Sequence, residues 1–87
     1  MGAVRDSITR TLTEAFQPAS LEVVDESHLH KGHAGWSEGG ETHFRVRITA
    51  PAFAGMTRVA IHRAINDALK AELAGDVHAL AIEAKAA

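Results

Sequence analysis

Cysteine is absent from this chain of 87 residues. Its absence excludes disulfide bonds, and with them the cross-linked framework of a small secreted domain. It also excludes thiolates as nucleophiles and as metal ligands, so any metal chemistry has to use other side chains. The composition therefore fits a reducing compartment, and we expect a cytoplasmic location.

Other features are missing as well. No apolar run approaches the roughly 20 residues of a membrane-spanning helix, and no apolar signal-peptide region is seen, so we expect no membrane association. The formal net charge of −2 lacks the positive excess that is typical of phosphate-backbone binding, although it is compatible with a local basic patch. Neither a nucleophile elbow nor a Walker-type phosphate loop occurs. We therefore expect that the chain alone is not an enzyme.

The length indicates a single domain over residues 1–87. A chain of this size buries only about 60% of the surface that it exposes when unfolded, so its core is thin. There is little room for a deep private active site. We therefore expect a binding function on the surface, exercised with a partner by a monomer or a weak homodimer.

Near the N-terminus, apolar residues recur at every fourth position and polar residues fill the other sides. This spacing predicts an amphipathic helix with one buried stripe. The stripe consists of Val4, Ile8, Leu12 and Phe16. Pro18 is expected to end the helix, because proline disfavours helical geometry in the residue before it.

Two segments are expected to form the first strands. Residues 21–24 form a short segment that is β-branched toward its end, and residues 43–49 alternate between polar and apolar side chains. The polar face of the second segment carries His43, Arg45 and Arg47. A loop rich in glycine and histidine, at about residues 26–42, joins the two strands, which most simply form an antiparallel hairpin. Loops of this length within a compact domain are often functional.

The second half of the chain predicts one long helix and one strand. A turn at residues 53–55 leads to Thr57, a suitable N-cap, and Gly75 is suited to follow the end of the helix. The apolar stripe of this helix is Ile61, Ile65, Leu69 and Leu73. Residues 77–84 are mostly apolar and are expected to form the last strand. The order predicts an α+β fold, with helices packed on one face of a three-stranded mixed sheet.

The chain contains six histidines, three of which lie close together in the loop. These three are His28, His30 and His33, and His78 stands at the start of the last predicted strand. Neutral imidazole is a good ligand for iron, zinc or copper. The spacing alone is also compatible with solvated loop histidines, with a His78 that only caps the sheet, and with a private zinc site in the loop.

Basic residues gather on the long predicted helix. They are Arg58, His62, Arg63 and Lys70, with Arg45 and Arg47 expected on a nearby strand face. Such a patch could contact phosphates. An ordinary solvated helix face is the alternative, because Asp67 and Glu72 dilute the positive charge.

Five segments, taken together and in this order, resemble the BolA family. They are Asp25-Glu26-Ser27 with His30, residues 41–46 (Glu-Thr-His-Phe-Arg-Val), residues 53–56 (Phe-Ala-Gly-Met), His62-Arg63, and residues 77–81 (Val-His-Ala-Leu-Ala). The resemblance covers about residues 4–85. It implies an α-β-β-α-β fold related to class II KH domains.

The resemblance also implies two roles. The first is an iron–sulfur accessory protein that binds a monothiol glutaredoxin and shares a [2Fe–2S] cluster with it, with glutathione supplied through the glutaredoxin, in cluster trafficking or iron homeostasis. The implied ligands are His78 and either His30 or His33, and His28 is a further candidate in the same loop. The second role is DNA binding and transcriptional regulation, for which the basic helix face is the candidate surface.

Overall fold

The computed structural model describes residues 2–26, 43–75 and 77–86. The elements follow in the order α1 (Ala3–Phe16), β1 (Ser20–Asp25), β2 (His43–Ala50), the 3-10 helix η2 (Pro51–Phe53), α2 (Arg58–Ala68), α3 (Lys70–Ala74) and β3 (Ala79–Ala86). The predicted order of helices and strands is therefore confirmed. No helix in the described ranges is both long and apolar enough to cross a membrane.

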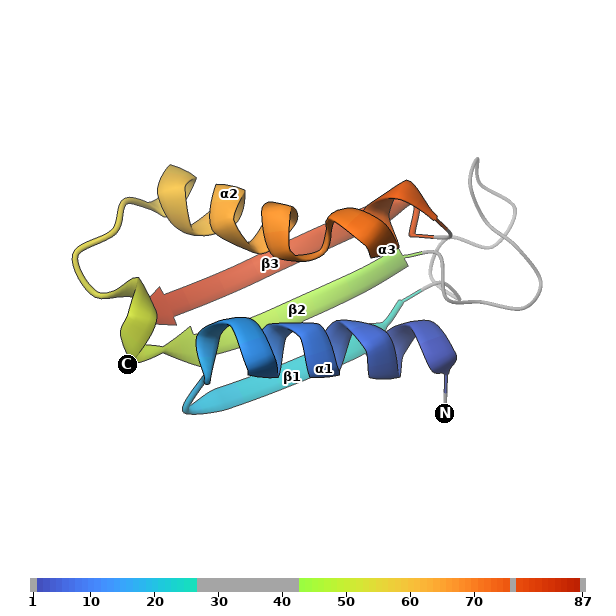
Figure 1. Cartoon of the computed structure of the whole chain (residues 1–87), viewed down its shortest axis with the longest axis horizontal. Coiled ribbons are helices and arrows are strands. Elements are labelled where there is room, and N and C mark those ends of the chain that lie inside the picture. The colour runs from blue at the N-terminus through green and yellow to red at the C-terminus, as the bar shows by residue number, and fades with distance from the viewer. Residues whose placement is uncertain (1, 27–42, 76, 87) are drawn as a thin grey trace.

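The three strands form one mixed sheet in the order β1-β2-β3. β1 pairs antiparallel to β2, as predicted for the hairpin, and β3 pairs parallel to β2. A parallel neighbour requires a crossover connection, which η2, α2 and α3 provide. Figure 1 shows α1 running along β1 and β2, and α2 and α3 running along β3.

The core lies between the helices and one face of the sheet. The alternation in β2 places Phe44, Val46 and Ile48 on this face, and each is at most 2% exposed. The predicted stripes of the helices meet them, because Ile8 and Leu12 of α1 are also buried. Burial thus confirms the predicted alternation of β2 and the predicted apolar stripe of α1.

The ends of the first two helices are set by local main-chain and side-chain contacts. Gln17 takes the left-handed conformation, with φ of 47°, and its N–H donates to the carbonyl of Thr13. The Thr57 hydroxyl accepts a hydrogen bond of 3.1 Å from the Ala60 N–H, which confirms the predicted N-cap of α2. Before it, Gly55 has φ of 79°, a turn conformation that favours glycine.

The long predicted helix is interrupted at Leu69, which corrects the sequence interpretation. The backbone of Leu69 has φ of −96° and ψ of 18°, outside the helical range, and separates α2 from α3. The apolar spacing nevertheless continues, because the N–H of Leu69 still donates to Ile65 and that of Leu73 to Leu69. The break therefore leaves the buried stripe intact, and Leu69 itself stays fully buried.

The last strand begins two residues later than expected and also ends two residues later. Val77 is buried in the core, but its N–H donates to the carbonyl of Glu72 at 3.4 Å instead of pairing within the sheet. Gly75 follows α3 as expected, with φ of −96° rather than a left-handed value. These contacts leave His78 immediately before β3.

Candidate functional site

One end of the sheet gathers the end of β1 and the starts of β2 and β3 (Figure 1). The register pairs Asp25 with Phe44 and His43 with Ala79. The N–H of Glu26 donates to the carbonyl of His43 at 2.7 Å. The two residues that flank segment 27–42 are therefore tied together beside the start of β3, where His78 lies.

Two imidazoles meet at this end of the sheet. The ring centroids of His43 and His78 are 5.3 Å apart, and the rings are tilted by 53°. His43 is buried, with 6% of its surface exposed, whereas His78 is exposed. His78 is therefore not sealed in the core and can present an imidazole nitrogen to a ligand.

The other histidines proposed as ligands lie elsewhere in the chain. His28, His30 and His33 fall outside the described residues, and so does the zinc site considered for them. Within residues 2–26, 43–75 and 77–86, no three His, Cys, Asp or Glu side chains are grouped in a way that could hold a metal ion.

Sequence reasoning missed His43 as a neighbour of His78. Its alternation with Phe44 placed it on the polar face of a strand, which by itself suggests exposure. The contact depends on the parallel register that puts Ala79 opposite His43. No local pattern reports this register, because residues far apart in the sequence establish it.

The face of the sheet opposite the helices carries a network of ion pairs. Arg45 contacts Glu26 at 2.9 Å and Glu83 at 2.7 Å. Arg47 contacts Glu22 at 2.9 Å and Glu83 at 3.4 Å. The hydrogen bond from Arg45 lowers the pKa of the Glu83 carboxyl most. Burial, the next largest influence, raises this pKa, and the charge of Arg47 lowers it further.

This network corrects the expected basic patch. Arg45 and Arg47 lie across the sheet from the helices, and glutamates neutralise both of them. Arg58, His62 and Arg63 do lie together, since all three line a hollow of about 360 Å³ on α2. Lys70 lies beyond the break at Leu69, at the start of α3.

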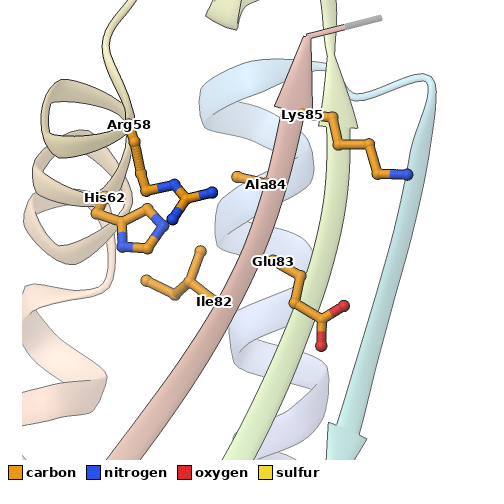
Figure 2. A pocket seen from close by; sticks show the side chains of 6 residues that line it. All are labelled: Arg58, His62, Ile82, Glu83, Ala84 and Lys85. Carbon is orange, nitrogen blue, oxygen red and sulfur yellow. The ribbon is translucent and has the colours of Figure 1, made fainter.

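A second hollow, of about 420 Å³, lies between α2 and β3. Arg58 and His62 of α2 line it together with four consecutive residues of β3, 82–85. In Figure 2 the side chains of Arg58 and His62 extend toward β3. The hollow therefore combines polar groups of a helix with one edge of the sheet.

These features define a class of protein: a small α+β domain whose mixed sheet carries helices on one face and an exposed histidine at one end. The BolA-like protein family model matches residues 12–87. The chain belongs to the BolA-like family.

Similar proteins agree with this assignment. The chain is 56% identical to an uncharacterized protein from Sinorhizobium sp., over 93% of the chain and 88% of that protein. It is 42% identical to the DNA-binding transcriptional regulator BolA of Vibrio cholerae, over 91% of the chain and 71% of the regulator. Among solved structures, the BolA domain of SufE1 from Arabidopsis thaliana matches with a TM-score of 0.89 and 42% identity, over 99% of this chain and 94% of that one.

Proposed function

We propose that the protein is an iron–sulfur accessory protein that binds a monothiol glutaredoxin and shares a [2Fe–2S] cluster with it. Its output would be cluster trafficking or iron homeostasis. The exposed imidazole of His78 is the observation that carries this proposal. It lies at the end of the sheet from which segment 27–42, with three further histidines, departs.

The donor set fits a shared cluster better than a private one. The chain has no cysteine, so thiolate ligands have to come from the partner and from glutathione. The chain would contribute His78 and either His30 or His33, with His28 as a further candidate in the same segment. When bound, such a cluster supplies a redox-active iron centre whose reduction potential is raised by histidine ligation.

The test reconstitutes the cluster on the full chain with a monothiol glutaredoxin, ferrous iron, sulfide and glutathione. Visible absorption and circular dichroism are recorded with and without this protein. We expect the spectrum of the glutaredoxin cluster to change when the chain is added, and His78→Ala to abolish that change. The proposal is contradicted if the cluster spectrum is the same with and without this protein, or if the His78→Ala variant changes it as the wild type does.

A ligand-exchange variant serves as the matched control. His78→Cys replaces the imidazole by a thiolate, which also binds iron in clusters. We expect His78→Cys to form a cluster shared with the glutaredoxin, with an altered spectrum. His78→Ala should form no shared cluster. Equal loss in both variants would assign His78 a structural role instead of a ligand role.

DNA binding is a second candidate function. Arg58, His62 and Arg63 line one hollow on α2, and the similar protein of Vibrio cholerae carries the name of a DNA-binding transcriptional regulator. Phosphate contacts of this kind position a protein on a duplex without reading its sequence.

Fluorescence anisotropy with duplex DNA at stepped salt concentrations tests this function. If Arg58 and Arg63 each neutralise one phosphate, replacing both by glutamine makes the negative slope of log affinity against log salt shallower by about 1.8. Arg47→Gln is the control, because glutamates pair with that guanidinium on the opposite face of the sheet. Absence of binding at low salt excludes this second function.

A further inference from the structure

The two edges of the sheet differ in how their main chain is occupied. At the edge formed by β1, the Arg5 Nε of α1 donates to the carbonyl of Val23 at 3.0 Å. At the opposite edge, no side chain in the described part of the protein donates to or accepts from the main chain of β3. Alternate residues of an edge strand direct their N–H and C=O groups away from the sheet. β3 is therefore the edge at which a further strand could pair.

The hollow of about 420 Å³ follows this edge. All four residues from Ile82 to Lys85 line it, although successive side chains of a strand point to opposite faces. Figure 2 shows Ile82 and Ala84 on the side of α2, whereas the side chains of Glu83 and Lys85 extend away across the sheet. Glu83 and Lys85 therefore line the hollow through their main chain, which makes it a groove along the backbone edge of β3.

A smaller hollow of about 210 Å³ continues this groove. It shares Arg58, His62, Ala84 and Lys85 with the first hollow and adds Met56, among others. Met56 is a large apolar side chain with 37% of its surface exposed. The edge from residue 82 to residue 86 is about 13 Å long, which matches four to five residues of an extended peptide.

The charges in the groove favour an acidic occupant. Arg58 forms no ion pair with the described residues, and it stands beside His62 on the helical wall. The acidic residue nearest in the lining is Glu83, but its carboxylate lies on the other face, bound by Arg45 and Arg47. Among the residues that the structure describes, the groove thus offers a guanidinium and an imidazole without a matching carboxylate.

We infer that the groove between α2 and β3 binds an extended acidic segment of a partner protein. The segment adds a strand beside β3, places a carboxylate at Arg58 and His62, and directs an apolar side chain toward Met56. Recognition of this kind draws its affinity from main-chain hydrogen bonds and its specificity from side-chain contacts. Neither the cluster nor the glutaredoxin of the proposed function is needed for it.

Other occupants match the groove less well. A nucleic-acid strand carries negative charge but lacks the alternating main-chain N–H and C=O groups that pair with a strand edge. A second copy joined through β3 would bring Arg58 of both chains to the same junction, where the two guanidinium charges repel.

The test uses the full chain, labelled with ¹⁵N, and a short peptide that carries glutamate and valine on the same face of an extended strand. We expect the amide signals of residues 57–63 and 80–86 to shift on titration, while those of residues 20–25 stay in place. A peptide with glutamine for glutamate should bind more weakly, because it lacks the carboxylates. A peptide with N-methylated valines should not bind, because it cannot donate main-chain hydrogen bonds.

Variants then test the wall of the groove. Arg58→Gln and His62→Gln should each weaken binding of the acidic peptide by about two- to fivefold, as expected for partly exposed polar pairs. Arg10→Gln, which changes an exposed arginine on α1, should leave the Kd unchanged. Binding that is insensitive to both groove variants overturns the inference.

Three further results would also overturn it. The first is that no amide shifts at millimolar peptide, or that the shifts fall on β1. The second is that an oligothymidylate shifts the groove amides while the peptide does not, which makes nucleic acid the occupant. The third is that sedimentation shows a dimer whose β3 amides are broadened without any ligand, which makes a second copy the occupant.

Discussion

The buried ring of His43 supports the exposed ring of His78, with 5.3 Å between their centroids and a tilt of 53°. Tilted contacts at this distance are the favourable arrangement for aromatic rings. His43 belongs to β2, whereas His78 precedes β3 in a short connection that Val77 anchors in the core. The position of His78, the proposed ligand, therefore depends on His43, which is not itself proposed as a ligand.

Replacing His43 tests this support. We expect His43→Ala to lower the free energy of unfolding by about 1–3 kcal/mol, as for other losses of buried volume. The ring ¹H resonances of His78 should move, because the neighbouring ring no longer shifts them. His43→Phe keeps an aromatic neighbour and should leave these resonances closer to their original positions. Unchanged His78 resonances in His43→Ala would show that the two rings are not packed in solution.

The ion pairs on the open face of the sheet predict a pH-dependent contribution to stability. The hydrogen bond from Arg45 lowers the pKa of Glu83 below its ordinary value. A carboxyl with a lowered pKa in the folded state stabilises the fold fully above its unfolded pKa, about 4.3, and loses this contribution as the pH falls through the folded pKa.

Urea unfolding of the wild type and of Glu83→Gln at pH 7 and pH 3 measures this effect. At pH 7 the variant should be less stable, and the difference should shrink toward pH 3, because the contribution of Glu83 is lost as the pH falls through its lowered pKa. Arg45→Gln should show the same trend, because it removes the hydrogen bond that lowers the pKa most. A stability difference that is equal at both pH values would contradict the prediction.

Glu72 joins α3 to α1 and also to the connection that leads to His78. Its carboxylate accepts hydrogen bonds from Ser7 at 2.8 Å and Thr11 at 3.1 Å, and its carbonyl accepts from Val77. Burial alone would raise the pKa of Glu72, but the hydrogen bonds from Ser7, from its own amide and from Thr11 outweigh it, so the pKa is lowered.

A double-mutant cycle tests this connection. We expect Glu72→Ala to cost about 1 kcal/mol, since the hydrogen bonds are only half-buried. Ser7→Ala should cost less, and the two changes should not be additive, because each removes the same bond. Glu14→Ala, at an exposed position of α1, is the control and should change stability little. Strict additivity would mean that the Ser7–Glu72 bond contributes nothing.

Two threonines offer a matched pair for the cap of α2. Thr57 accepts from the Ala60 N–H as the N-cap, so Thr57→Ala should cost about 1 kcal/mol. Thr13 is exposed within α1, and its hydroxyl donates to the carbonyl of Thr9. Thr13→Ala should be neutral or slightly stabilising, because alanine has the higher helix propensity. Thermal unfolding of the two variants separates these cases, and equal costs would contradict the assignment of the cap.

Much of the fold could be predicted because the responsible signals are local. Apolar residues at every fourth position in α1 and α2, and the alternation in β2, predict which side chains are buried. The observed burial confirms these predictions. The N-cap at Thr57 was predictable for the same reason, since a cap depends on a few successive residues. The candidate site was predictable only as residue types, with His78 identified by family resemblance.

By itself, the sequence determined the order of the elements, their buried faces and the absence of any thiol from the chain. Only the tertiary structure decided the break at Leu69, the late start of β3, the contact between His43 and His78, and the pairing of Arg45 and Arg47 with glutamates. The reason is that periodic burial is encoded by near neighbours, whereas strand register and ion pairing join residues that are distant along the chain.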